Sequence, residues 1–146
     1  NKDVTITNSN MTRFMMSLNE AVDLVEYAFE NGNQGDLFVQ KSPSATIEVL
    51  AQSLIQIFDS KSKIKNIGIR HGEKFHETLL SKEEKIISED LGDYYKLPAD
   101  NRDLNYEKYF SKGRKTDELD EFNSNNTIRL TEESLIELLA SIGYKT

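Results

Sequence analysis

The stretch IKNIGIRHGE, residues 64–73, does most to decide the fold. Its Ile-rich first part, 64–69, is typical of a β-strand, and a basic residue, a glycine and an acid follow it. Side chains at the carboxyl end of such a strand in an α/β protein point into the crevice where small molecules bind. An arginine fork suits phosphate oxygens, and a carboxylate accepts hydrogen bonds from a diol. Arg70 and Glu73 therefore favour a ligand with a phosphate next to a sugar, although many strands simply end in solvated charges.

Strands and helices alternate on both sides of this stretch. Period-two patterns predict strands at 4–7 and 36–40, and apolar residues at helical spacing predict a helix after each strand. Four residues have the form of helix N-caps: Ser17, Thr46, Ser81 and Thr131. The order strand, helix, strand, helix, strand favours α/β layering over a helical bundle. We expect the apolar stripes of the amphipathic helices to form the core, including that of the first helix: Leu18, Ala21, Val22, Val25, Ala28 and Phe29.

Four regions follow from the change of composition along the chain. Residues 1–92 are predicted to form the main α/β region, and 93–110, with Tyr, Pro and charged residues, an extended arm. Residues 111–126 are rich in Lys, Asp, Glu, Ser and Asn and are predicted to form a mobile polar loop. A strand and a last amphipathic helix are expected in 127–146.

Composition excludes several classes of function. The 146 residues carry a net charge of −7, which disfavours a nucleic-acid binder. There is no Cys and there are only two His residues, so neither a thiolate metal site nor a histidine-rich one is expected. No run approaches the roughly 20 apolar residues that cross a bilayer, and we expect a cytoplasmic protein. The chain starts without Met in what looks like a strand, which suggests a piece of a longer protein.

Four motifs in order resemble one enzyme family. They are Asn10-Met11-Thr12-Arg13-Phe14, then 35–54, 69–84 and 89–106. Together they resemble the carboxyl-terminal part of bacterial capsule and flagellar-glycan UDP-N-acetylglucosamine 4,6-dehydratases, most closely the capsular 5-inverting type. That group belongs to the extended short-chain dehydrogenase/reductase superfamily. The resemblance implies an α/β fold with short strands, amphipathic helices and an extended arm, forming the substrate-binding part of a two-part enzyme.

The same resemblance implies an amino-terminal Rossmann portion that holds NADP and the catalytic groups. This chain has no G-x-x-G-x-x-G turn for dinucleotide phosphates and no Tyr-x-x-x-Lys pair. The NADP-binding Rossmann core is therefore absent, and we assign no catalytic, cofactor-binding or metal residue here. The chain alone is expected to be inactive.

Site residues come from the resemblance, motif by motif. It implies that Arg13 and Arg70 hold the UDP diphosphate and that Glu73 holds the uridine ribose hydroxyls, with Met11 and Thr12 lining the same pocket. Met11 is equally compatible with core packing, and His71 and His76 are expected on the surface or in packing. Gly72 allows a backbone angle that other residues avoid, so the turn can aim Arg70 and Glu73 to one side.

Partners also follow from the resemblance. In the family, the arm matching 93–106 extends onto a neighbouring subunit and helps to build a hexamer; a loop folded over its own domain is the alternative. The expected partners are thus a UDP-sugar, the Rossmann portion and further copies of the enzyme. Two other functions stay open: a stand-alone nucleotide-sugar-binding or assembly module, and the substrate half of a related reductase such as a 4-epimerase or the retaining dehydratase.

Overall fold

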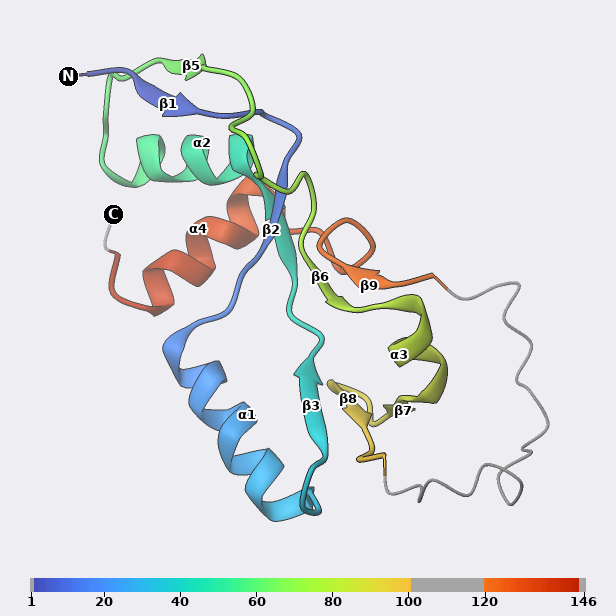
Figure 1. The fold of residues 1–146 in the computed structure, drawn as a ribbon. Helices are drawn as coiled ribbons and strands as arrows, with labels where there is room; N and C mark the ends of the chain where they lie inside the picture. Colours follow the sequence, from blue (N-terminus) through green and yellow to red (C-terminus); the bar gives the residue numbers. More distant parts are fainter. Residues whose placement is uncertain (1, 101–119, 145–146) are drawn as a thin grey trace. The chain divides into compact units, whose positions relative to one another are not determined.

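The computed structural model describes residues 2–100 and 120–144. Its fold is of the mixed α/β class that the sequence predicts (Figure 1). The chain divides into two compact units, each made of separate stretches of sequence. The first comprises Asn1–Ser17, Ser42–Glu77 and Asn123–Thr146, and the second Leu18–Lys41 and Thr78–Phe122.

The first unit contains two small sheets and two helices. Its elements are β1 (Val4–Ile6), β2 (Thr12–Phe14), β4 (Ser44–Thr46), α2 (Ile47–Ile57), β5 (Ile64–Asn66) and α4 (Glu132–Ser141). Strand β1 pairs in parallel with β5, and β2 pairs antiparallel with β4, so that Arg13 lies opposite Ala45. Helix α2 packs against β1, β4 and α4. The buried apolar side chains of this unit are those of Ile6, Met11, Ala45, Ala51, Ile57 and Leu135.

Local capping fixes where α2 and α4 begin. The Thr46 hydroxyl accepts a hydrogen bond from the Val49 N–H at 3.1 Å. At α4, the Thr131 hydroxyl accepts from the Ser134 N–H, and the Ser134 hydroxyl accepts from the Thr131 N–H at 2.9 Å. These bonds satisfy backbone donors that a helix leaves unpaired in its first turn, which is why both predicted caps are confirmed.

The second unit places one long helix beside a three-stranded sheet (Figure 1). Its elements are α1 (Leu18–Asn31), β3 (Leu37–Gln40), β6 (Thr78–Leu80), α3 (Lys82–Ile87), β7 (Glu89–Asp90) and β8 (Tyr94–Leu97). The sheet has the antiparallel order β3-β8-β7. Strand β6 pairs with β9 (Phe122–Asn123), the strand in which the second unit ends. The buried apolar side chains are those of Val39, Leu80 and Phe122.

A buried carboxylate closes the turn between α1 and β3. The Asp36 side chain, only 6% exposed, accepts hydrogen bonds from the Asn33 N–H at 2.9 Å and the Ala99 N–H at 3.1 Å, and Lys96 Nζ lies 3.3 Å away. These two N–H groups, and then the ammonium, lower the pKa of Asp36 from its ordinary 3.8 to about 2. Gly35 occupies the same turn with φ = +88°, a left-handed conformation that suits glycine.

Most predicted elements are confirmed, and one strand is shorter than expected. The helix after Ser17 begins at Leu18 and ends at Asn31, and Ser81 forms the predicted capping box at α3. The strand predicted over 64–69 ends at Asn66 instead. Gly68, with φ = +90°, takes the backbone out of the extended conformation two residues later.

Two predicted regions differ from the expectation over the few residues of them that the structure describes. Within the predicted arm 93–110, Tyr94–Leu97 is a paired strand of the unit's own sheet, and residues 101–110 lie outside the described part. Within the predicted mobile loop 111–126, Phe122 and Ser124 are buried; residues 111–119 are not described. The strand expected after residue 126 is reduced to one isolated bridge between Ser44 and Arg129.

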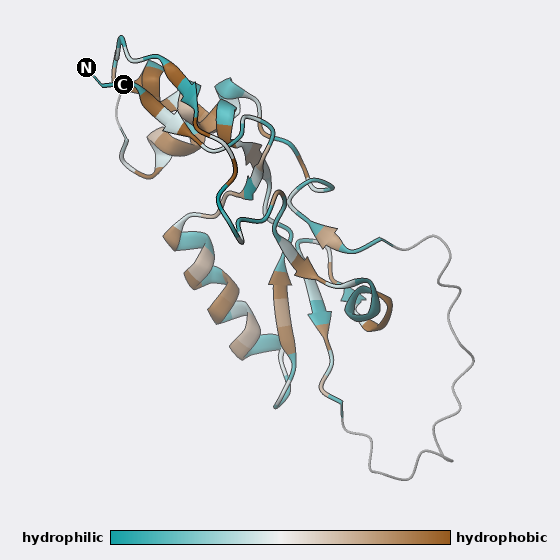
Figure 2. Cartoon of the chain, turned by 45° about the horizontal axis from the view of Figure 1, so that its top comes forward, coloured by the Kyte–Doolittle hydropathy of each residue, from teal (hydrophilic) through white to brown (hydrophobic). Residues whose placement is uncertain are grey.

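The third correction concerns the expected core. No residue of α1 is buried, and Leu18, Val22, Val25 and Phe29 are each more than half exposed. The hydrophobic bands along α1 are visible in Figure 2. Among the described residues, no helix is long and apolar enough to span a membrane.

Candidate functional site

Arg13 lies in the middle of β2 and binds the segment of residues 73–77. Its guanidinium donates to the carbonyl oxygens of Thr12 at 2.7 Å and Lys74 at 3.0 Å. Its nitrogens also lie 3.7 Å from a carboxylate oxygen of Glu73 and 3.5 Å from one of Glu77. The Arg13 side chain is 26% exposed, so the ion pairs are open to solvent. Arg13 therefore fixes the position of the segment that carries Glu73.

Glu73 is held by donors on both of its carboxylate oxygens. Oε1 accepts from the Thr7 hydroxyl at 2.9 Å, and Oε2 accepts from the Arg70 N–H at 3.2 Å. The Arg70 N–H, the Thr7 hydroxyl and the charges of both arginines lower the pKa of Glu73 below its ordinary value. The side chain is thus an ionised acceptor near neutral pH, and an ionised carboxylate has about four lone-pair positions, of which these bonds use two.

The turn before Glu73 has the geometry that the sequence predicts. Gly72 has φ = +79°, and the Glu73 N–H donates to the Arg70 carbonyl at 3.1 Å. Arg70 itself is exposed, and its charge contributes to the lowered pKa of Glu73. The structure therefore gathers the three charged site residues, Arg13, Arg70 and Glu73, around the Glu73 carboxylate.

A buried hydroxyl network supports this group from inside. The Thr12 hydroxyl lies 2.7 Å from His76 Nδ1 and 2.6 Å from the Ser124 hydroxyl. The Ser124 hydroxyl also donates to the Thr12 carbonyl at 3.1 Å and accepts from the Glu77 N–H at 2.9 Å. The network joins β2, which carries Arg13, to the end of the segment that carries Glu73. Sequence reasoning missed Ser124, because no local pattern relates it to Thr12.

Two of the expected pocket residues are interior side chains. Met11 is 0% and Thr12 is 1% exposed, so neither reaches the surface in this structure. Met11 therefore has the core-packing role that was the alternative for it, and Thr12 belongs to the hydroxyl network. His76 is a packing residue, as expected, since it contacts Thr12 and lies edge-on against Phe75.

The groups that lie together here are guanidinium donors and an ionised carboxylate. The described residues contain no group of three or more His, Cys, Asp or Glu side chains placed to bind a metal ion. Guanidinium donors and an ionised acceptor lie together, which suits an anionic ligand with neighbouring hydroxyls. Since Arg13 already contacts two carboxylates and three backbone carbonyls, those of Thr12, Lys74 and Phe75, a phosphate would have to replace at least one carboxylate partner.

Comparison with known proteins gives the family of this chain. The α/β fold matches a solved structure described as the X-ray structure of Pen from Bacillus thuringiensis. The match has a TM-score of 0.77 and 27% identity, and it covers 99% of this chain and 41% of that one. The fold class is that of the carboxyl-terminal part of an extended short-chain dehydrogenase/reductase. Residues 1–99 match the polysaccharide biosynthesis protein family and 100–144 match its carboxyl-terminal family, so the chain belongs to the polysaccharide biosynthesis proteins.

Curated relatives match over nearly the whole chain. A protein named UDP-glucose 4-epimerase from Rickettsia bellii (strain OSU 85-389) is 59% identical over 145 residues, which are 99% of this chain and 42% of the relative. A protein of the same name from Rickettsia felis is 57% identical over 144 residues, 98% of this chain and again 42% of the relative. The chain therefore spans about two fifths of the length of the relatives it matches.

Proposed function

We propose that this chain is the substrate-binding part of an NAD(P)-dependent enzyme that modifies a UDP-linked hexose for surface polysaccharide. The observation that carries the proposal is the cluster of Arg13, Arg70 and Glu73 on a fold of this family. In it, Arg70 is exposed and available to a diphosphate, and Glu73 retains lone pairs for ribose hydroxyls. Arg13 contributes its charge and holds the segment 73–77 in place.

The cofactor is a property of the proposed complete enzyme. A nicotinamide cofactor would accept a hydride from C4 of the sugar and return it later. This chain contains neither a glycine-rich phosphate turn nor a Tyr-x-x-x-Lys pair, and we assign none of its residues to the cofactor. Its proposed task is to bind and orient the UDP-sugar, and the isolated chain is expected to bind weakly and convert nothing.

Two reactions fit this substrate. The ordered motifs at 10–14, 35–54, 69–84 and 89–106 favour the 5-inverting 4,6-dehydratase, in which water is lost across C5 and C6 and the hydride returns to C6. The name of the Rickettsia relatives favours 4-epimerisation, in which the hydride returns to the opposite face of C4. Dehydration lowers the mass of the sugar by one water, whereas epimerisation leaves it unchanged.

Product analysis tests the proposal and separates these reactions. The polypeptide extended amino-terminally by its own reading frame is incubated with UDP-N-acetylglucosamine or UDP-glucose, and the products are examined by mass spectrometry and NMR. Loss of water with inversion at C5 supports the dehydratase, and an isomer inverted only at C4 supports the epimerase. Absence of both conversion and UDP-sugar binding would refute the function and leave the stand-alone assembly module.

Assembly into a homo-oligomer, a hexamer in the parent family, stays part of the proposal. The segment expected to reach a neighbouring subunit is 93–106. Because Tyr94–Leu97 already pairs within its own sheet, the contact would have to be made by the outer face of β8 or by the following residues. Light scattering of the complete polypeptide with and without residues 101–106, a deletion that keeps the Ala99 N–H on Asp36, tests it.

A further inference from the structure

Helix α1 carries an apolar seam that is exposed. Leu18, Val22, Val25 and Phe29 are 87%, 55%, 52% and 84% exposed. Their spacings of four, three and four residues repeat the a and d positions of a heptad, which place four side chains along one line of a helix. We call these four residues the α1 seam. A row of large apolar side chains in water is typical of a surface that another element covers.

The seam is distinct from the side of α1 that the unit itself uses. Tyr27 packs edge-on against Phe38 at a ring distance of 5.8 Å and stacks on Tyr94 at 4.3 Å. These contacts attach α1 to β3 and β8. The helix therefore has one apolar side that contacts the sheet and a second that the described residues of its own unit leave exposed.

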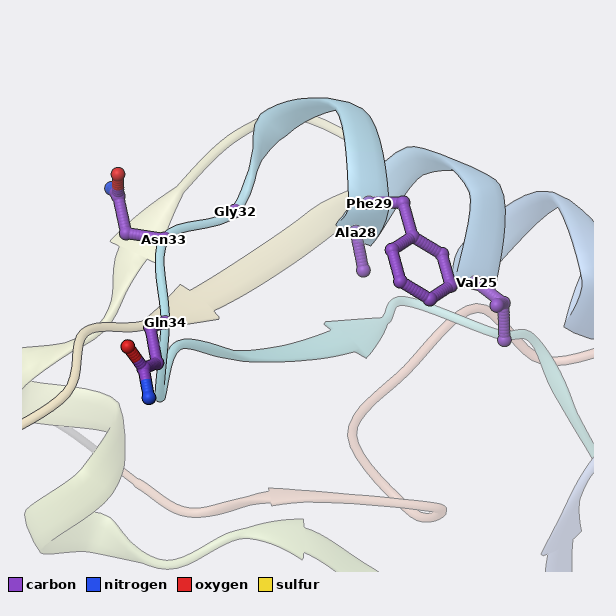
Figure 3. Close-up of a pocket in the computed structure, with 6 residues that line it drawn as sticks. All are labelled: Val25, Ala28, Phe29, Gly32, Asn33 and Gln34. Atoms are coloured by element: carbon purple, nitrogen blue, oxygen red, sulfur yellow. The ribbon is translucent and has the colours of Figure 1, made fainter.

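A hollow extends the seam at the carboxyl end of α1. It has a volume of about 400 Å³ and is lined by Val25, Ala28, Phe29, Gly32, Asn33 and Gln34. Figure 3 shows Val25 and Phe29 on neighbouring turns of α1, with the turn from Gly32 to Gln34 closing the end. The seam thus offers a row of apolar contacts and, at one end, room for a large side chain.

The charge of helix α1 favours a different partner over a second copy of this chain. Helix α1 contains no Lys or Arg, and its remaining surface carries Glu20, Asp23, Glu26 and Glu30. Two copies packed seam to seam would bring two acidic helices together, which like-charge repulsion disfavours. A helix with basic residues flanking its own apolar stripe suits the seam better.

We propose that the α1 seam is covered by a helix from the part of the polypeptide that relatives carry amino-terminal to this region. The chain spans 42% of those relatives, and its last residues match the family's carboxyl-terminal part, so most of a relative's other residues precede the matched region. The inference rests on the proposed function, since it requires this chain to be one part of a longer enzyme. The inference further identifies the α1 seam as the surface that joins the two parts. It also predicts Lys or Arg residues beside the apolar stripe of the covering helix.

Cysteine labelling tests the proposal, because the chain itself has no Cys. Val25→Cys lies in the seam, and Asp23→Cys, on the acidic side, is the matched control. The rate of maleimide labelling of each variant is measured in the 146-residue chain and in the polypeptide extended amino-terminally by its reading frame. Peptide mass mapping distinguishes the introduced cysteine from any cysteine in the extension. Val25→Cys is expected to react at least about tenfold more slowly in the extended polypeptide, as burial of an apolar side chain implies, and Asp23→Cys at an unchanged rate.

Equal rates for Val25→Cys in the two polypeptides would overturn the proposal. So would protection of Val25→Cys that rises with the concentration of the 146-residue chain, because that shows a second copy on the seam. Circular dichroism and a repeat with Val22→Cys exclude a folding defect of one variant. UDP-sugar binding and conversion are measured on the same extended polypeptide. Protection with neither binding nor conversion refutes the proposed function alone, and conversion without protection refutes this inference alone.

Discussion

Ser124→Ala is the sharpest test of the hydroxyl network. The substitution removes the 2.6 Å contact to the Thr12 hydroxyl, the bond to the Thr12 carbonyl and the acceptor of the Glu77 N–H. Ser124 is fully buried, so water cannot easily replace these partners. A buried group left without its partner costs about 1–3 kcal/mol, and we expect a loss of that size in the free energy of unfolding.

The assay is urea unfolding of the chain, followed by circular dichroism. The midpoint should fall while the slope with denaturant stays constant, which indicates lost stability rather than a changed unfolded state. Ser141→Ala is the control: Ser141 is exposed, its hydroxyl donates to the Leu138 carbonyl of the same helix, and its loss should change stability by less than about 0.5 kcal/mol.

A double-mutant cycle makes the reasoning refutable. Thr12→Val keeps the side-chain shape but removes the other hydroxyl, so the double variant should lose less than the sum of the single losses. Strict additivity, or a Ser124→Ala variant as stable as the Ser141→Ala control, would show that the network does not hold β2 to the segment 73–77.

Three further predictions concern stability. The pKa of Asp36 is lowered from 3.8 to about 2 in the folded state, so the ionised carboxylate stabilises the fold. This contribution to the free energy of unfolding is present above about pH 4 and is lost as the pH falls toward 2. An Asp36→Asn variant should lack this acid dependence in thermal unfolding. Gly35→Ala should destabilise more than Gly92→Ala: both have positive φ, which costs about 1–2 kcal/mol, but only at Gly35 would the new Cβ meet another atom, at 2.9 Å. Equal losses in denaturant titrations would contradict this. Leu135→Ala removes a fully buried side chain and should cost about 2–5 kcal/mol by the same titration, and a loss under 1 kcal/mol would contradict the packing of α4.

Local signals in the sequence predict local structure well. The hydroxyls of Thr46, Ser81 and Thr131 each lie three residues before the backbone N–H they cap, so the pattern and the contact are the same stretch of chain. Gly72 likewise has the left-handed angle expected before Glu73. Such features depend on a few neighbouring residues and need no knowledge of the rest of the fold.

Contacts between residues far apart in the sequence cannot be predicted from such local patterns. Ser124 contacts Thr12 across 112 positions, and nothing in a serine among Asn residues indicates that it is buried. The α1 seam could be predicted only in part: helical spacing identifies an apolar face of the helix, but it does not identify the element that covers this face. The expected core role of Leu18 and Phe29 failed within this chain for that reason. Met11 and Thr12 are buried in this structure, and the motif alone left open whether Met11 lines a pocket or packs in the core, because it gives the order of residues and not the direction of their side chains.

The most direct test of the central claim is calorimetric titration of the extended polypeptide with UDP-N-acetylglucosamine. Glu73→Gln and Arg70→Ala should each weaken binding roughly 10- to 100-fold, the equivalent of about 1.5–3 kcal/mol for a hydrogen bond to a charged group. Lys61→Ala, which removes an exposed charge elsewhere, should bind like the unaltered polypeptide. Unchanged affinity in both Glu73→Gln and Arg70→Ala would show that the ligand is held elsewhere.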